Sequence, residues 1–340
     1  MIVLVMSTAA ICCGGRKSPI PPTQIANPPT VSCPEEIALV SHQGQPQPTA
    51  NFDTPTAQDG EPPVNVTCTP ASGSEFPNGH TIVTCEATDA RARKGSCMFS
   101  VVVTPVPLLS KTRFMAFGDS LTEGKTMLLS RGAVVIPTRK PPVFNNDVSY
   151  VSQLYAKMAE RYQDQEITII AEGFGARTAS DDKDREREVL DEWKTDALLL
   201  LEGTNDLYVS PGTAGINSAA DALQRMVRDA KAKGVRVFLA TLPPMNSHAE
   251  KAKPRLATEQ AVPLLNERIR GIAAAEGVTL VDLFAVVPVT ELGNDGLHPT
   301  EAGYGLMADE WLKAIIETME IKPSPVEEAP QSFSRARAPR

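Results

Sequence analysis

The stretch "FMAFGDSLTEGKT", residues 114–126, starts as an apolar run and breaks at Gly118-Asp119-Ser120 into a polar segment that is compatible with a helix. Short apolar runs of this kind are typical of buried strands, and Gly, Asp and Ser are ordinary turn-forming residues. A serine nucleophile at the end of a strand explains the same pattern. The remainder of the chain decides between a plain turn and a reactive serine.

Four further apolar runs follow, and amphipathic segments separate them. The runs are ITIIA (167–171), ALLLLEG (197–203), VRVFLAT (235–241) and VTLVDL (278–283). Near-continuous apolar strands that alternate with helices indicate a parallel sheet that is covered by helices on both faces. We therefore expect a doubly wound α/β domain over residues 112–321.

The region before this domain has a different pattern. Residues 27–105 are rich in Pro, Thr, Ser and Gly and contain short alternating runs such as HTIVTCEAT (80–88) and CMFSVVVTP (97–105). This pattern is typical of a small all-β sandwich. Residues 106–111 are predicted to be a linker, and the Pro-rich segment 322–340 is predicted to be a disordered tail.

Length and composition fit a soluble two-domain protein. The chain has 340 residues, of which 42% are hydrophobic and 22% are charged, with a net charge of −8. Outside the extreme C-terminus it has no dense Lys/Arg cluster, so a nucleic-acid partner is not expected. No internal apolar run approaches the roughly 20 residues of a membrane span, so no span is expected either.

The N-terminal stretch MIVLVMSTAAICCG, residues 1–14, has the length of a signal-peptide core. We interpret residues 1–26 as a signal or leader segment followed by a short linker. The expected location is therefore outside the cytoplasm: secreted, periplasmic or at the cell surface. A lipid anchor at Cys12 or Cys13 is an alternative that the leader leaves open.

The remaining four cysteines all lie in the β-rich region, at positions 33, 68, 85 and 97. An even set in one small segment of an exported chain indicates disulfides, and the absence of a C-x-x-C spacing gives no support to a metal site. Cys85 and Cys97 flank a polar turn symmetrically around Arg91, so they are expected to face each other on two hairpin strands. We therefore predict the pairs Cys85–Cys97 and Cys33–Cys68.

Four polar clusters follow the apolar runs of the C-terminal domain. They are GDS (118–120), GFGART (173–178), GTND (203–206) and NDGLHP (294–299). Each cluster taken alone has an ordinary explanation as a turn or a helix cap. In an open parallel sheet, however, ligands bind beyond the carboxyl ends of the strands, where these clusters converge. The complete set therefore indicates a functional site.

The segments FGDSLTEG, EGFGART, GTND and DGLHP, in that order, resemble the four sequence blocks of the SGNH (GDSL-type) hydrolases, a family of esterases and lipases. The resemblance implies a flavodoxin-like three-layer α/β/α fold. In the β-rich region, CPEEI (33–37), the segment 66–90 and SCMFSVVV (96–103) resemble the HYR (hyalin repeat) domain. That resemblance implies an immunoglobulin-like module of extracellular proteins, associated with adhesion.

A serine hydroxyl becomes a good nucleophile only when an adjacent base takes its proton. His298, in the DGLHP segment, is the histidine best placed for this role. Asp295 lies three residues before His298, and in the family this spacing lets the carboxylate orient the imidazole. We therefore predict a catalytic triad of Ser120, His298 and Asp295.

The tetrahedral intermediate of ester hydrolysis needs hydrogen-bond donors for its oxyanion. The backbone N–H of Ser120 is one candidate, and the family role of Asn205 is to offer its side-chain amide. Related esterases carry glycine where this chain has Ala176, so the third donor is the N–H of either Ala176 or Gly175. Two residues are expected to have supporting roles. Asp119 is expected to brace the turn that carries Ser120, and Gly173 belongs to the GFGART segment that contains Gly175 and Ala176.

Together these observations predict a secreted serine esterase that hydrolyses carboxylic esters through an acyl-enzyme, with neither metal nor cofactor. Its expected partners are small-molecule or polysaccharide esters, and the β-sandwich is a candidate for contact with a cell surface or glycan. One alternative is a carbohydrate deacetylase similar to acetyl xylan esterases. Another is an adhesion or carbohydrate-binding protein whose hydrolase domain is vestigial, although the intact set of predicted site residues argues against it.

Overall fold

The computed structural model describes residues 27–123, 148–252 and 256–322. The predicted leader, residues 1–26, and the predicted tail from residue 323 onward lie outside these ranges. The chain divides into two compact units. One is β-rich and runs up to Thr104 apart from Val40–Pro46, and the other is α/β and starts at Pro105, with Val40–Pro46 grouped with it. Every helix in the described ranges is too short or too polar to cross a lipid bilayer.

The β-rich unit contains one sheet of four antiparallel strands in the order β2-β6-β5-β4. These strands are β2 (Ile37–Ser41), β6 (Lys94–Pro105), β5 (Gly79–Thr88) and β4 (Asn65–Thr69). A second small sheet pairs β1 (Thr30–Val31) with β3 (Ala57–Gln58). Alternate residues of β5 and β6, such as Val83 and Val101, are fully buried, because successive side chains of a strand point to opposite faces. The all-β prediction is confirmed.

The predicted disulfide pairing is wrong: the bonds are Cys33–Cys97 and Cys68–Cys85. Cys85 does lie opposite Cys97 across the hairpin, as expected, but β5 is an inner strand, and Cys85 also lies opposite Cys68 on β4. The Cα atoms of Cys68 and Cys85 are only 4.0 Å apart. Hairpin symmetry reveals one neighbour of Cys85 and not the other, so it could not identify the bonded partner.

Metal binding by these cysteines does not follow from their proximity. The sulfur atoms of Cys33, Cys85 and Cys97 lie within 4.8 Å of one another. In the part of the chain that the structure describes, they are the one group of side chains close enough together to hold a metal ion. All three are disulfide-bonded, and the thiolate is the form of cysteine that ligates metals.

The α/β unit is built on a sheet of five parallel strands in the order β12-β11-β10-β8-β9. The strands are β8 (Arg113–Gly118), β9 (Thr168–Gly173), β10 (Ala197–Leu201), β11 (Arg236–Ala240) and β12 (Thr279–Val281). Numbered within the domain, this is the flavodoxin-like order 2-1-3-4-5. Every residue of the central strand β10 is buried, as a sheet covered on both faces requires.

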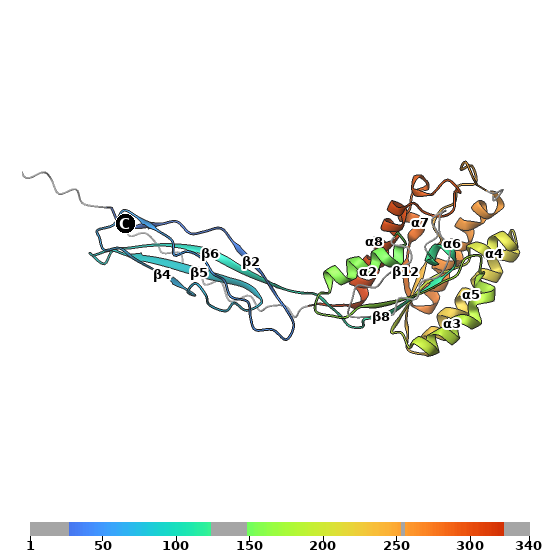
Figure 1. Cartoon of the computed structure of the whole chain (residues 1–340), viewed down its shortest axis with the longest axis horizontal. Helices are drawn as coiled ribbons and strands as arrows, with labels where there is room; N and C mark the ends of the chain where they lie inside the picture. The colour runs from blue at the N-terminus through green and yellow to red at the C-terminus, as the bar shows by residue number, and fades with distance from the viewer. Residues whose placement is uncertain (1–26, 124–147, 253–255, 323–340) are drawn as a thin grey trace, which may run out of the picture. The chain divides into compact units, whose positions relative to one another are not determined.

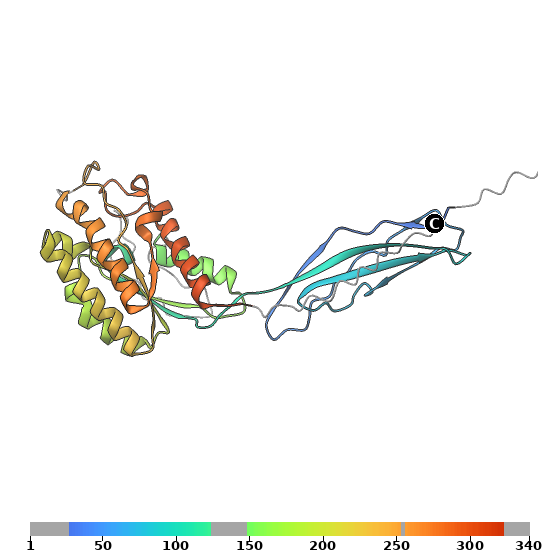
Figure 2. The same cartoon turned by 180° about the vertical axis from the view of Figure 1, so that it is seen from behind.

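Two helical layers cover this sheet (Figures 1 and 2). Helices α2 (Tyr150–Arg161) and α8 (Glu301–Met319) pack together in one layer. Helices α3 (Ala179–Trp193), α5 (Thr213–Ala232) and α6 (Leu256–Glu276) form the other. The shorter helices are α1 (Ser120–Glu123), α4 (Thr204–Val209), α7 (Leu283–Val286) and the 3₁₀ turn η1 (Val289–Glu291). The predicted three-layer α/β/α fold is confirmed.

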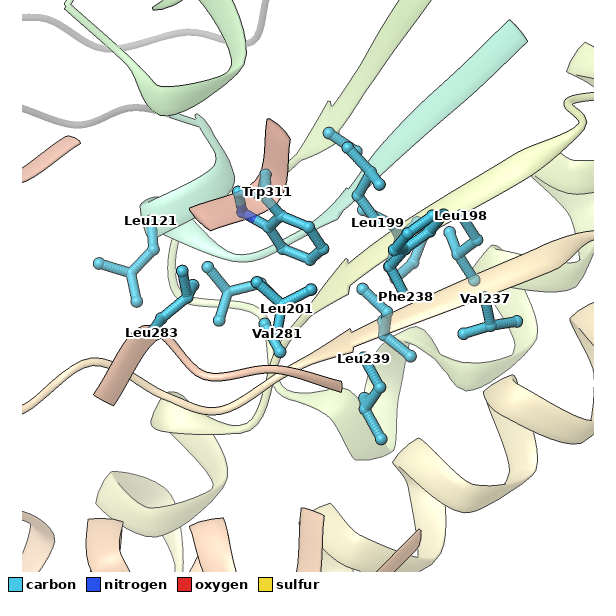
Figure 3. Close-up of a cluster of buried hydrophobic side chains, with 14 of the residues drawn as sticks. Leu121, Leu198, Leu199, Leu201, Val237, Phe238, Leu239, Val281, Leu283 and Trp311 are labelled. Atoms are coloured by element: carbon cyan, nitrogen blue, oxygen red, sulfur yellow. The ribbon is translucent and has the colours of Figure 1, made fainter. Parts of the chain in front are cut away.

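The core of the α/β unit lies directly beneath the strand ends that carry the predicted site. Figure 3 shows Trp311 of α8 among Leu121, Leu199 and Leu201. All four side chains are at most 2% exposed. Leu121 follows Ser120 in the chain, and Trp311 belongs to the helix that begins just after His298. The same apolar cluster therefore anchors both predicted site segments.

Residues 106–111, which were expected to form a linker, contain the short strand β7 (Leu108–Leu109). This strand pairs antiparallel with β13 (Glu320–Ile321), at the end of α8. The side chain of Gln165 also donates to the carbonyl oxygen of Leu109 and accepts from its N–H, at 2.9 and 2.6 Å. Leu109 is accordingly buried within the α/β unit.

Candidate active site

Three predicted site residues form a continuous series of hydrogen bonds at the carboxyl edge of the sheet. The Oγ of Ser120 lies 2.9 Å from Nε2 of His298. The Nδ1 of the same imidazole lies 2.6 Å from Oδ2 of Asp295. Ser120 starts α1 directly after β8, whereas Asp295 and His298 lie in the loop before α8. The fold thus brings together groups that are 178 residues apart in the chain.

The position of Ser120 follows from the residues on either side of it. A Cβ at Gly118 would clash with the carbonyl oxygen of Leu201 on the neighbouring strand, so only glycine fits there. The carboxylate of Asp119 accepts the N–H of Leu121 at 2.9 Å and so closes the turn. These contacts hold Ser120 at the point where β8 becomes α1, with its side chain facing His298.

The His298 loop is held by the carboxylate of Asp295. Its Oδ1 accepts the N–H groups of Leu297 and His298, both at 3.0 Å, while its Oδ2 contacts the imidazole. Burial alone would raise the pKa of Asp295, but these hydrogen bonds lower it to about 2. A charged carboxylate at this position keeps the proton on Nδ1 and leaves Nε2 free to accept from the Ser120 hydroxyl.

Asn205 also reaches this edge of the sheet, from the start of α4. Its side-chain Nδ2 donates to the carbonyl oxygen of Arg177 at 2.8 Å. A longer contact of 3.4 Å joins the same nitrogen to Oδ2 of Asp119, the residue before Ser120. The structure therefore places this amide beside the segment that carries Ser120.

The GFGART segment forms a tight turn over residues 174–177, in which the N–H of Arg177 donates to the carbonyl oxygen of Phe174 at 3.4 Å. Ala176, at the third position of the turn, has a φ of 66°. Type II turns require a positive φ there, which glycine adopts freely and alanine adopts at a cost of about 1 kcal/mol. The N–H of Gly175 donates to Oε2 of Glu123 at 2.8 Å. Across the described ranges, no acceptor is found for the N–H of Ala176.

A sequence-family comparison is consistent with this geometry. The model of the GDSL-like lipase/acylhydrolase family matches residues 116–306, more than half of the 340-residue chain. The chain belongs to the GDSL-like lipase/acylhydrolase family. The HYR domain model matches residues 26–103, the β-rich unit. No curated protein matches the chain.

Solved structures show the same fold as the GDSL hydrolase unit. One is described as a GDSL-like lipase from Parabacteroides merdae ATCC 43184; it is 18% identical with a TM-score of 0.51, and the match covers 62% of this chain and 98% of that one. Another is LAE5, an alpha/beta hydrolase enzyme from the metagenome of Lake Arreo, Spain. It is 19% identical with a TM-score of 0.51, and the match covers 61% of this chain and 96% of that one.

Behind the GDSL serine lies a buried pair of acidic side chains that the sequence analysis only half anticipated. Gly118 and Leu201 are register partners on β8 and β10, so Asp119 and Glu202, the residues that follow them, lie at adjacent strand ends. Each of these acids is 1% exposed. Burial raises the pKa of Asp119 to about 6, and it raises the pKa of Glu202 well above its usual range. Two neighbouring carboxyls in such a site do not readily ionise together.

Glu123 and Glu202 are site residues that the sequence analysis missed. Glu202 ends the run ALLLLEG, whose pattern predicts only a strand. Glu123 lies inside the FGDSLTEG block, three residues after Ser120. This nearness to the predicted nucleophile was the one sequence feature that could have indicated a site residue. Its hydrogen bond to Gly175, however, spans 52 residues of sequence and depends on how β9 ends.

Proposed function

We propose that this protein is an exported serine esterase that hydrolyses carboxylic esters through an acyl-enzyme. The observation that carries the proposal is the series of hydrogen bonds from Ser120 through His298 to Asp295, with distances of 2.9 and 2.6 Å. Membership of the GDSL-like lipase/acylhydrolase family supports ester hydrolysis. The disulfides and the HYR domain point to an extracellular location, which supports export.

In the proposed first step, the Oγ of Ser120 attacks the ester carbonyl while Nε2 of His298 takes the hydroxyl proton. The charge on Asp295 stabilises the imidazolium that forms. The imidazolium then donates this proton to the departing alkoxide, so an alcohol leaves and an acyl-enzyme remains. In the second step water attacks the acyl carbonyl with His298 as base, which releases the carboxylic acid and restores Ser120.

We assign the proposed oxyanion hole to the N–H groups of Ser120 and Ala176 and to the side-chain amide of Asn205. Ala176 is preferred to Gly175 because the N–H of Gly175 already donates to a carboxylate. One N–H of Asn205 is held by a backbone carbonyl, which fixes the amide plane. Its second N–H makes only a 3.4 Å contact, so it is available to an oxyanion.

The experiment is an ester panel on the purified full chain and on Ser120→Ala. We expect the wild-type protein to cleave p-nitrophenyl esters, and the variant to lose about 1000-fold or more in kcat. Acyl groups from acetate to octanoate, together with acetylated sugars, would show which acyl length and leaving group the site prefers. An unchanged rate in Ser120→Ala would refute the proposal.

A further inference from the structure

The carboxylate of Glu123 connects the end of α1 to the turn that carries Ala176. Glu123 lies three residues after Ser120 in the chain, and its Oε2 accepts the N–H of Gly175 at 2.8 Å. We propose that Glu123 is a positioning residue for the oxyanion hole, because its carboxylate holds the 174–177 turn in the conformation that directs the Ala176 N–H into the site. This inference rests on the proposed esterase function.

The turn is fixed to the nucleophile segment at two places. Its first residue, Phe174, donates its N–H to the carbonyl oxygen of Gly118 at 3.0 Å, and its second residue, Gly175, donates to Glu123. The strand end before the turn also packs directly on α1, since a Cβ at Gly173 would clash with the backbone N of Glu123. The turn and Ser120 are therefore held as one unit. Two side chains join them: Glu123 through the N–H of Gly175, and Asn205 through the carbonyl oxygen of Arg177.

The alanine in this turn makes the anchor necessary. Ala176 is exposed and has a φ of 66°, a conformation that a non-glycine residue rarely adopts without support from its surroundings. The hydrogen bond that closes the turn, from Arg177 to Phe174, is long at 3.4 Å. Without the Glu123 carboxylate, Ala176 is free to relax to a negative φ, which rotates the peptide group that carries its N–H.

This reasoning predicts that Glu123 and Ala176 are energetically coupled. Glycine adopts a positive φ without strain, so a chain with Ala176→Gly depends less on the Glu123 anchor. Residues that share one contact network show such non-additive effects in double-mutant cycles. Urea unfolding of each variant separates this coupling in kcat from a general loss of stability, because the strain that glycine removes is worth only about 1 kcal/mol.

The experiment compares Glu123→Ala, Glu123→Gln, Ala176→Gly and the double variant Glu123→Ala/Ala176→Gly with the wild-type full chain on p-nitrophenyl acetate. We expect Glu123→Ala to lower kcat by about 10- to 100-fold with KM within about threefold, somewhat less than the loss of a whole oxyanion donor. Glu123→Gln should stay within about threefold of wild type, because an amide oxygen accepts the same N–H. On a logarithmic scale, the double variant should recover at least about half of the decrease in kcat that Glu123→Ala causes.

Glu276→Ala is the matched control. Glu276 is a partly buried carboxylate that accepts hydrogen bonds from Arg228 and Gln224. Glu276 ends α6 just before β12 begins, so it lies near the amino ends of the strands, whereas Ser120 lies beyond their carboxyl ends. We expect this variant to keep the wild-type kcat while losing comparable hydrogen bonds.

The outcomes separate this inference from the proposed function. An inactive wild-type protein, or an active Ser120→Ala, overturns both. If the wild type is active and Ser120→Ala is not, a wild-type kcat in Glu123→Ala overturns the positioning role alone. Equal losses in Glu123→Ala and Glu123→Gln, or no recovery in the double variant, also overturn it.

Discussion

Each unit of this protein contains a carboxylate that accepts several backbone N–H groups, and the two carboxylates differ in the side chain with which they pair. Asp89, in the β-rich unit, accepts the N–H groups of Glu61, Arg91 and Arg93 and pairs with the guanidinium of Arg93. Asp295, in the GDSL unit, accepts two backbone N–H groups of its own loop and pairs with an imidazole. In each, burial acts to raise the pKa, but the hydrogen bonds lower it to about 2.

A lowered carboxylate pKa therefore does not by itself mark a reactive site. A guanidinium does not serve as a proton carrier in catalysis, so the pair of Asp89 and Arg93 braces a loop. The imidazole of His298 can gain and lose a proton, and it lies 2.9 Å from a serine hydroxyl. The chemical difference therefore lies in the partner and in what that partner touches.

We expect the largest effect on activity from removing the negative charge of Asp295 in the GDSL unit. We expect Asp295→Asn to lower kcat for p-nitrophenyl acetate by about 1000- to 10,000-fold, because an amide no longer stabilises the imidazolium or favours the correct tautomer. Steady-state kinetics at pH 7 to 8 measures this loss. A kcat within tenfold of wild type would show that the partner of His298 is not important for the reaction.

Asp119 differs from both carboxylates in the net shift of its pKa, because at this position burial outweighs the hydrogen bond from Leu121 and raises the pKa. Its pKa is about 6 in the folded protein and 3.8 in its ordinary state. The folded state therefore binds the proton of Asp119 more tightly, and the contribution of Asp119 to the free energy of unfolding should fall as the pH rises from about 4 to 6. The change is up to about 3 kcal/mol, at 1.36 kcal/mol per pKa unit.

Asp119→Asn should remove this fall, so the variant gains stability relative to wild type as the pH rises through that range. Urea unfolding of both proteins at pH 4, 5, 6 and 7 measures the difference. A constant difference across these values would contradict the raised pKa of Asp119.

Asp89→Asn tests the corresponding carboxylate of the β-rich unit. We expect it to lower the thermal midpoint of the β-rich unit by several degrees, because a charged acceptor of several hydrogen bonds becomes a neutral one. The same variant should leave kcat for p-nitrophenyl acetate unchanged. Calorimetry and kinetics on one preparation test both expectations, and a parallel loss of kcat would mean that Asp89 affects the esterase site.

The smallest expected effect concerns backbone conformation rather than charge. Ala176→Gly should raise the free energy of unfolding by about 0.5 to 1 kcal/mol, because glycine accepts the positive φ that alanine accepts with strain. Its kcat should stay within about twofold of wild type, since the N–H is retained. Urea titration measures the stability gain, and a clear destabilisation would contradict the strain.

Much of the GDSL unit could be predicted from sequence because its strands are buried on both faces. The apolar run at 235–241 contains the observed strand β11 (Arg236–Ala240). Because the polar motifs follow parallel strands, Ser120 and His298 could be expected at the same edge of the sheet, where their side chains lie 2.9 Å apart. The partner of Cys85 could not be predicted, because it depends on which of two neighbouring strands supplies the bonded cysteine. The bond from Glu123 to Gly175 depends on the exact end of β9, which no local pattern encodes.

The most direct test of the proposed chemistry is covalent labelling of the full chain with a fluorophosphonate, followed by peptide mass mapping. Such a reagent reacts with a serine whose proton is taken by an adjacent base and whose oxyanion hole is formed. The proposal predicts one stoichiometric adduct on Ser120, with labelling abolished in His298→Ala. An adduct on another residue, or an unlabelled Ser120 in a folded protein, would contradict it.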